Sequence, residues 1–539
     1  MANAWWRSAV IYQVYPRSYC DKDGNGIGDI PGLISKLDYI AALGVDVIWL
    51  SPVYPSPMED FGYDVTDHCN VDPMFGTLND ARDLIGAAHD LGLKIIVDLV
   101  LSHTSNQHPW FQESRRDRFN VKANWYVWAD AADDGSPPNN WLSLFGGSAW
   151  EWEPVRKQYY LHNFLVSQPD MNFHNPEVQE AALNVVKFWL ELGVDGFRLD
   201  TVNFFFHDAE LRSNPPISKD IEIRSVPSDY PYAMQSHLYD KSRPETLIFL
   251  ERFRKLLDGY GEKLTVGELS TDEAVADQMR AYSESNKRLS MVYGFDLFCE
   301  TPTAGELGKI IEERQRNIGD GWTCNSLSNH DVKRVVSRWG FEDQAKDAGV
   351  MLTAFVCTLQ GTPCLFQGDE LGLEESSIAF EDLQDPFGKR FWPEFKGRDG
   401  CRTPMPWTSQ GEFAGFSSVK PWLPVSVSHF VKAVDVQEAD PRSTLGRVRA
   451  FLAWRKANRS YFVGTFELLN LPEPALGIVR ASGSETLLAV FNFGKQPLTL
   501  DISKYGTARL IRGCGFDDAE IDGAKLFLGA ASAAFAQLD

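Results

Sequence analysis

A run of six residues from Gly196 to Thr201, GFRLDT, combines a charged pair with the spacing of a strand end. On a strand, Arg198 and Asp200 face the same side, because side chains alternate between the two faces. A neighbouring guanidinium lowers the pKa of an aspartate by roughly 1–3 units, which suits a nucleophile or a charge stabiliser. A structural salt bridge is the other interpretation of this pair when it is taken alone.

Other predicted strands end on residues with related chemistry. They contribute Asp98 with His103, then Glu268, and later Asn329-His330-Asp331. So many polar groups at one rim are difficult to explain by stability, because unpaired buried charge is costly. Two carboxylates flanking a bond, one ionised and one protonated, are the minimal groups for glycoside cleavage. Lys263 is the only cation near Glu268 in sequence, so we predict a raised pKa for Glu268.

Three stretches with helical periodicity, 32–43, 79–91 and 176–192, each lead through Leu-Gly into an apolar strand. Such strands are typical of a parallel sheet covered by helices on both faces. Five more candidate strands lie at 9–14, 264–268, 292–296, 324–329 and 363–367. Eight strands with helices between them predict a (β/α)₈ TIM barrel, an α/β fold with its chemistry at the C-terminal strand ends. A doubly wound open sheet is the alternative, but no GxGxxG motif opens a helix.

The pattern divides the chain into four segments. The predicted barrel occupies 1–103 and 171–455, and an irregular subdomain rich in Trp, Asn, Pro and Gly is inserted after the third strand at 104–170. Further long insertions follow the fourth strand, at about 204–245, and the eighth, at about 371–435. Loops of this length in a compact domain are usually functional, and here we expect pocket walls. Alternating strands after 456 predict a C-terminal β-sandwich at 456–539.

Composition restricts the possible partners and location. The 539 residues carry a formal net charge of −22, which argues against nucleic acid and against anionic membrane surfaces. No apolar run reaches the ~20 residues of a spanning helix, and the N-terminal residues lack the pattern of a signal peptide. Eight scattered cysteines without metal-ligand spacing predict free thiols in a reducing, cytoplasmic setting.

Five motifs occur in order: DLVLSH at 98–103, QPDMN at 168–172, GFRLD at 196–200, GEL at 267–269 and NHD at 329–331. Together they resemble glycoside hydrolase family 13, the α-amylase family, in its branch of α-glucosidases and oligo-1,6-glucosidases. The resemblance extends from AVIYQVYPRSY near the start to GRDGCRTPMPW at 397–407, and the C-terminal segment matches only in kind. It implies a glycosidase with a TIM barrel and an inserted subdomain.

The resemblance also implies roles for the matching residues. Asp200 resembles the nucleophile, Glu268 the general acid and base, and Asp331 the carboxylate that holds the 2- and 3-hydroxyls of the sugar. Asp60 and Arg398 resemble the pair that binds the 4-hydroxyl and closes the pocket beyond one glucose. The other expected substrate contacts are Tyr63, His103, Phe145, Phe164, Gln168, Arg198, Thr201 and His330; for the two phenylalanines, core packing is an equal alternative. We predict retention of configuration, with the two carboxyl groups about 5–5.5 Å apart.

A loop near the N-terminus resembles the first part of an EF-hand. Asp21, Asp23, Asn25 and Asp29 place oxygen donors at positions 1, 3, 5 and 9, with a carbonyl ligand expected from Ile27. The loop lacks the closing glutamate, and a plain Asx-rich turn is the alternative. In family 13 the corresponding loop often holds Ca²⁺ or Mg²⁺ as a structural ion, so we expect such a metal here. No organic cofactor is expected.

Single positions modify the expectation. Family 13 usually has asparagine where this chain has Ser102, which argues against a second metal, and Pro406 stands where glutamine is usual. In this branch, valine after the nucleophile is associated with α-1,6 linkages and alanine or threonine with α-1,4 linkages. Thr201 therefore predicts an exo-acting α-1,4-glucosidase for short substrates such as maltose, with some transfer of glucose to sugar or alcohol acceptors.

Three alternatives are retained. One is an α-1,6-preferring glucosidase, and another is a transferase or isomerase of the same branch, such as a sucrose isomerase or a trehalose synthase. The arginine-rich RLDR-type loop of sucrose isomerases is not found in this sequence. The third is a non-catalytic relative, which is disfavoured because all three acids are present and no membrane anchor is found.

Overall fold

The computed structural model describes residues 4–218, 221, 226, 230–271 and 273–538. Its centre is a parallel sheet with the strand order β10-β11-β1-β2-β3-β7-β8-β9. The strands are β1 (Ile11–Val14), β2 (Val47–Leu50), β3 (Lys94–Leu99), β7 (Gly196–Leu199), β8 (Leu264–Leu269), β9 (Met291–Gly294), β10 (Cys324–Asn325) and β11 (Thr362–Phe366). A parallel bridge between Val292 and Thr323 joins the two ends of this order. The predicted TIM barrel is confirmed.

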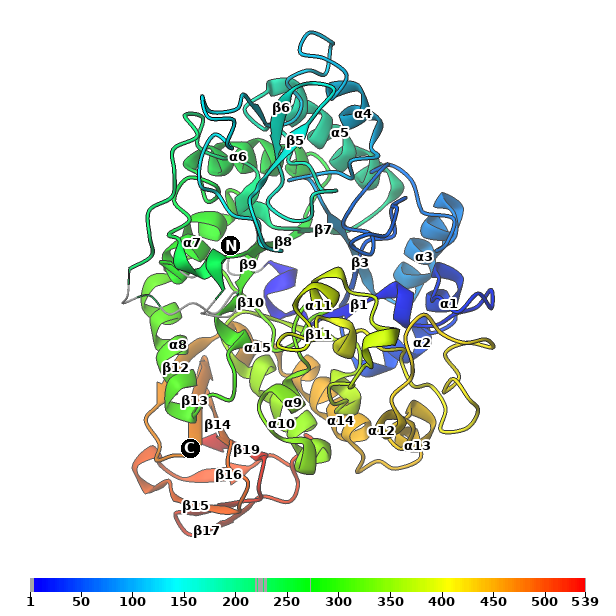
Figure 1. The fold of residues 1–539 in the computed structure, drawn as a ribbon. Helices are drawn as coiled ribbons and strands as arrows, with labels where there is room; N and C mark the ends of the chain where they lie inside the picture. Colours follow the sequence, from blue (N-terminus) through cyan, green and yellow to red (C-terminus); the bar gives the residue numbers. More distant parts are fainter. Residues whose placement is uncertain (1–3, 219–220, 222–225, 227–229, 272, 539) are drawn as a thin grey trace.

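Helices connect the strands and surround them on the outside (Figure 1). The main ones are α1 (Ile30–Ile34), α2 (Leu37–Leu43), α3 (Leu78–Asp90), α5 (Pro176–Leu192), α6 (Pro244–Asp258), α7 (Val275–Ser283), α8 (Ala304–Asn317) and α10 (Ala345–Thr358). Shorter or later helices are α4 (Pro109–Ser114), α9 (Val335–Arg338), α11 (Pro386–Phe391), α12 (Val427–Phe430), α13 (Val434–Glu438), α14 (Thr444–Ala457) and α15 (Arg459–Val463). Among the described residues, no helix is long and apolar enough to cross a membrane.

Antiparallel sheets lie at opposite ends of the molecule (Figure 1). The inserted segment contains one, with the order β4 (Trp128–Ala129), β6 (Gln158–Leu161) and β5 (Trp150–Glu153). The C-terminal region has a sheet of β12 (Thr465–Leu469), β13 (Ala475–Ser482), β14 (Glu485–Asn492), β19 (Ser532–Leu538) and β16 (Ala508–Leu510), and a sheet of β15 (Leu498–Asp501), β18 (Lys525–Leu528) and β17 (Glu520–Asp522). Val490, Leu500 and Leu526 belong to one buried cluster, so the two C-terminal sheets share a core as a sandwich does.

Two predicted strands end earlier than expected. The strand expected at 324–329 contains only Cys324–Asn325, because the Ser326 hydroxyl bonds the carbonyls of Ser328 and Cys364 and the chain leaves the sheet. The strand expected at 292–296 ends at Gly294 and continues as a 3₁₀ helix, Phe295–Phe298.

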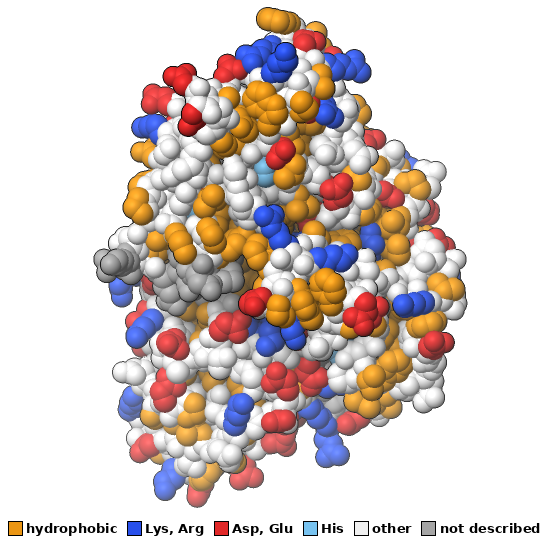
Figure 2. All heavy atoms as spheres, viewed as in Figure 1, with side chains coloured by type: hydrophobic (Ala, Val, Ile, Leu, Met, Phe, Trp, Pro, Cys, Tyr) orange, Lys and Arg blue, Asp and Glu red, His pale blue; other side chains and the backbone are white. Residues whose placement is uncertain are grey.

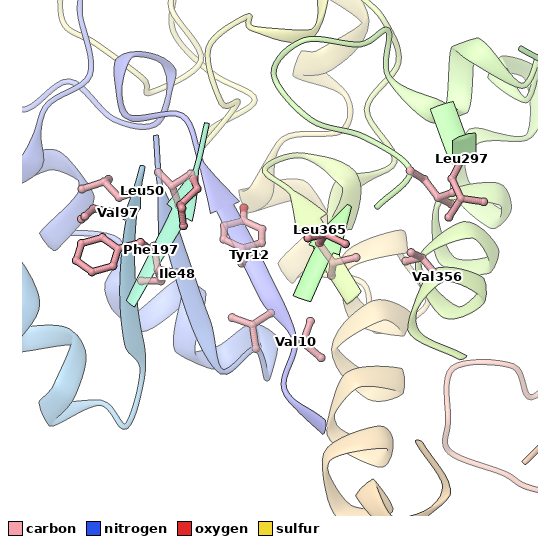
Figure 3. Packing of buried hydrophobic residues seen from close by; sticks show 14 of the residues in the cluster. Val10, Tyr12, Ile48, Leu50, Val97, Phe197, Leu297, Val356 and Leu365 are labelled. Carbon is pink, nitrogen blue, oxygen red and sulfur yellow. The ribbon is translucent and has the colours of Figure 1, made fainter. Parts of the chain in front are cut away.

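The barrel strands alternate between two buried layers. Tyr12, Ile48, Val97 and Phe197 point into the cluster shared with the surrounding helices, and Figure 3 shows them together. Their neighbours, such as Ile96, belong to the cluster inside the barrel. Because Phe197 and Leu199 pack outward, Arg198 is directed into the barrel, as strand alternation predicted.

Gly196 permits β7 to pack directly on β8. It has φ 156°, and a Cβ added there would lie 1.8 Å from the Leu264 carbonyl oxygen. We predict that Gly196→Ala destabilises the fold by about 3 kcal/mol or more, because the clash involves backbone that is held by the barrel.

Gly86→Ala is the matched control, because Gly86 lies in α3 with open space around its Cβ position. Alanine there should be neutral or stabilise by about 0.5–1 kcal/mol. Thermal unfolding midpoints of both variants test the prediction, which fails if Gly196→Ala melts with the parent protein.

Candidate active site

Arg198 binds three carboxylates from three strands. Its side chain is fully buried, and Nη1 donates to Asp98 Oδ1 at 2.7 Å and to Asp200 Oδ1 at 2.6 Å. Nη2 lies 2.7 Å from Glu268 Oε2 and donates to the Tyr293 hydroxyl at 2.8 Å. One guanidinium thus holds the two predicted catalytic acids at the same depth in the barrel.

Burial changes the protonation expected for these acids. Desolvation raises the pKa of Asp200 to about 7, although Arg198 acts in the opposite direction. The lowered pKa predicted for Asp200 is therefore wrong, because the sequence did not show how completely the pair is buried. Desolvation also raises the pKa of Glu268 to about 7, as predicted, but Glu268 is not remote from cations, since Arg198 contacts it.

Thr201 occupies a conformation that few threonines adopt. Its φ and ψ are 37° and 48°, in the left-handed region, which is strained for a β-branched residue. In this conformation its N–H donates to Glu268 Oε2 at 3.0 Å, and its hydroxyl donates to Asp200 Oδ2 at 3.1 Å. The hydroxyl also lies 3.0 Å from Ser102 Oγ, which in turn lies 2.9 Å from His103 Nδ1. Thr201 therefore connects both acids.

Asp331 lies among basic groups. Arg402 Nη2 donates to its Oδ1 at 2.8 Å, Arg398 Nη1 donates to the same oxygen at 3.2 Å, and His330 Nε2 lies 3.2 Å from Oδ2. Desolvation would raise the pKa of Asp331, but the contact with His330 and the charges of Arg398 and Arg402 outweigh it and hold the pKa below its ordinary value. Asp331 is the acid most firmly kept ionised.

A second ion-pair group lies at the site. Arg398 Nη2 lies 2.8 Å from Asp60 Oδ1 and 2.7 Å from Asp385 Oδ1. Gln168 Nε2 donates to Asp60 Oδ2 at 3.0 Å and lies 3.3 Å from His103 Nε2. The structure thus brings together the Asp60 and Arg398 pair that the sequence analysis singled out.

The two predicted histidines are buried and neutral at pH 7. Desolvation lowers the pKa of both His103 and His330 to about 3. His103 Nε2 lies 3.0 Å from the Tyr63 carbonyl, and the Tyr63 ring stacks on His330 with 5.3 Å between centroids and 3° between planes. Both histidines therefore act here as uncharged hydrogen-bonding groups.

These residues surround a cavity of about 1090 Å³ at the C-terminal ends of the barrel strands. The predicted site residues that line it are Asp60, Tyr63, His103, Phe145, Phe164, Asp200, Thr201, Glu268, Asp331 and Arg398. Gln168, Arg198 and His330 lie behind this lining and contact residues that belong to it. Acidic and basic side chains are interspersed over the face of the molecule shown in Figure 2.

Several residues at the site were not selected from the sequence. Asp385 lies in the insertion after β11, where no strand pattern marks it, and Tyr293 lies within β9, next to the last residue of that strand. Arg402 follows Arg398 by four positions in the same motif, which was the available signal. Glu375 also lines the cavity, and burial raises its pKa to about 7.

The N-terminal loop has the donor set of a cation site. Ligand oxygens of Asp21, Asp23 and Asp29 lie within 4.8 Å of one another. Asp21 accepts from Gly24 N and Gly26 N, and the Ser417 hydroxyl donates to its Oδ2 at 2.5 Å. Neighbouring carboxylates of this kind are the oxygen ligands that Ca²⁺ and Mg²⁺ prefer. Three of the five predicted ligands, Asp21, Asp23 and Asp29, therefore fit a divalent ion, and Asn25 Oδ1 accepts a hydrogen bond from Ile27 N.

Related proteins cover nearly the whole chain. A probable α-glucosidase of Rhizobium meliloti (strain 1021) is 51% identical over 501 residues, which cover 92% of this chain and 91% of that protein. An oligo-1,6-glucosidase of Parageobacillus thermoglucosidasius is 36% identical over 532 residues, with 92% of each chain covered.

Solved structures of similar proteins have the same fold. The α-glucosyl transfer enzyme XgtA has a TM-score of 0.97 at 50% identity, with both chains fully covered. The trehalulose synthase MutB from Pseudomonas mesoacidophila MX-45 has a TM-score of 0.88 at 30% identity, with 99% of each chain covered. The family model for the α-amylase catalytic domain matches residues 13–464. The chain therefore belongs to the α-amylase family, glycoside hydrolase family 13, and is a glycoside hydrolase.

Proposed function

We propose that this protein is a retaining, exo-acting α-glucosidase that releases terminal α-1,4-linked glucose from short substrates such as maltose. The observation that carries the proposal is the shared contact of Asp200 and Glu268 with Arg198 beside the cavity. It holds two carboxylates together, as a double-displacement mechanism requires.

In this mechanism Asp200 attacks the anomeric carbon. Its Oδ1 is engaged by Arg198, so Oδ2 is the oxygen left for attack, next to the Thr201 hydroxyl. Glu268 donates its proton to the leaving oxygen and then removes a proton from water. A pKa of about 7 suits a residue that performs both steps near neutral pH.

The second ion-pair group supports an exo mode. Asp60, Arg398 and Asp385 form this buried group, and its polar atoms match the hydroxyls of a terminal sugar. Asp331 lies next to Arg398 and is ionised, so it accepts hydrogen bonds from ring hydroxyls. We therefore propose that this group binds the terminal glucose and that the rest of the substrate extends away from it.

Acceptors other than water would give transglucosylation. Phe295, Val332 and Glu375 also line the cavity, whose volume of about 1090 Å³ leaves room for a sugar or alcohol acceptor. The similar structure XgtA is described as an α-glucosyl transfer enzyme, and MutB as a trehalulose synthase. Isomerisation of sucrose is therefore the second candidate, and product analysis with sucrose distinguishes it from hydrolysis.

We also propose a structural divalent cation, Ca²⁺ or Mg²⁺, bound by Asp21, Asp23, Asn25, the Ile27 carbonyl and Asp29. The ion would neutralise the clustered carboxylates and would take no part in breaking the glycosidic bond. Among the described residues the cysteines form no disulfide, and most of them are buried, which supports our proposal of a reducing, cytoplasmic location.

The catalytic assignment predicts the effect of Glu268→Gln. Loss of the general acid should lower kcat/KM for maltose by about 10²–10⁴-fold, because glutamine cannot protonate the leaving oxygen. The parent profile should fall above and below pH 7, since Glu268 must be protonated and Asp200 ionised and the pKa of each is about 7. Initial rates over pH 5–9 measure both effects, and NMR of the first-formed anomer tests retention. Full activity of the variant contradicts the assignment.

The linkage assignment predicts the effect of Thr201→Val. Valine has the same shape but removes the hydroxyl that contacts Asp200 and Ser102. The ratio of isomaltose to maltose hydrolysis should rise by roughly tenfold. Thr265→Val is the matched control, because its buried hydroxyl bonds Ser290 away from the cavity. Initial rates on maltose, isomaltose, sucrose, trehalose and maltotriose provide the measurement, and an unchanged ratio contradicts the role of Thr201.

The cation proposal predicts ligand-linked stability. Excess Ca²⁺ or Mg²⁺ added to chelator-treated protein should raise Tm by about 2 °C or more, because the ion binds only the folded loop. Asp23→Asn should abolish the increase, whereas Asp133→Asn, at an exposed aspartate of the inserted segment, should retain it. An increase that survives in Asp23→Asn places the ion elsewhere.

A further inference from the structure

Tyr293 contacts the general acid from the neighbouring strand. It is the third residue of β9 and 3% exposed, and its hydroxyl donates to Glu268 Oε1 at 3.1 Å. Tyr293 is not one of the described residues that line the cavity. We therefore infer that it acts through Glu268 and does not touch the substrate. Neither the family motifs nor the predicted site includes it.

The donors and acceptors around Tyr293 determine the direction of its hydrogen bond with Glu268. Arg198 Nη2 donates to the Tyr293 oxygen at 2.8 Å and also lies 2.7 Å from Glu268 Oε2. Because the phenol oxygen accepts from a guanidinium that has no acceptor of its own, the phenol proton is directed to Glu268 Oε1. The direction of this hydrogen bond is therefore set by Arg198.

The donors around Glu268 also identify which of its two oxygens carries the proton. Oε2 faces two donors, Thr201 N at 3.0 Å and Arg198 Nη2, and neither of them can accept a proton. The proton of neutral Glu268 therefore resides on Oε1, the oxygen that Tyr293 contacts. When this proton leaves, Oε1 becomes a charged acceptor, and its hydrogen bond from the phenol becomes stronger.

We propose that Tyr293 is a positioning residue for the general acid: its hydroxyl directs the proton on Oε1 of Glu268 toward the leaving oxygen and stabilises the carboxylate that remains. The inference rests on the proposed glucosidase function. The other charged groups that face Glu268 are Arg198 and Asp200 from β7 and the turn after it, Asp98 from β3, and Asp331 after β10.

Tyr293→Phe tests the proposal because it removes only the hydroxyl. The basic limb of the kcat/KM profile should move upward by about 1 pH unit, since ionised Glu268 loses a donor. The value of kcat/KM for maltose should fall about tenfold, whereas that for 4-nitrophenyl α-glucoside, whose leaving group needs little protonation, should change less than about twofold. Equal losses on both substrates, or an unmoved basic limb, would overturn the proposal.

Tyr12→Phe is the matched control. Tyr12 is also buried on a barrel strand, and its hydroxyl donates to a buried glutamate, Glu370 Oε1, at 2.8 Å. This variant should lose stability and leave the pH profile and the substrate ratio unchanged. Replacement of Tyr293 by 3-fluorotyrosine, a stronger donor, should move the basic limb downward; an upward or absent movement would also overturn the proposal.

An infrared titration separates this inference from the proposed function. The carboxyl band of Glu268, assigned by its loss in Glu268→Gln, should titrate at higher pH in Tyr293→Phe than in the parent protein. If the parent did not hydrolyse maltose, the proposed function would fail, and this titration would still test the Tyr293 contact. An identical titration in parent and variant would overturn the inference even in a fully active enzyme.

Discussion

One buried cation among three buried acids governs this site. Arg198 neutralises at most one of the charges on Asp98, Asp200 and Glu268, and none of these groups reaches solvent freely. Burial raises the pKa of Asp98 to about 6 and that of the other two to about 7. At neutral pH, protons are therefore shared within the group, which is the state that a nucleophile and an acid need at the same time.

The barrel is what makes this sharing possible. Parallel register pairs Asp98 with Arg198 across β3 and β7, and Arg198 with Val266 across β7 and β8. This register places Glu268, near the end of β8, against the guanidinium. The insertions then supply what strand ends cannot: Asp60 and Arg398 come from loops far apart in sequence and meet at the cavity.

How much of the site could be predicted from the sequence depended on whether each residue lies on a regular strand, in a family motif or in an irregular insertion. The common face of Arg198 and Asp200 followed from strand alternation, and the ordered motifs pointed to Glu268 and Asp331. The protonation of Asp200 did not follow, because desolvation depends on packing from all sides. Asp385 lies in an insertion without periodicity, and the importance of Tyr293 depends on a hydroxyl that bonds across strands. Such contacts have no signature in a single sequence.

The N-terminal loop also fastens distant parts of the chain. Asp21 N donates to the Phe416 carbonyl, Ser417 donates to the Asp21 carboxylate, and Trp422 N donates to the Gly26 carbonyl. These hydrogen bonds connect the segment that follows β1 to the insertion after β11, and the same insertion carries Arg398. The position of one wall of the cavity therefore depends on a loop that takes no part in the chemistry.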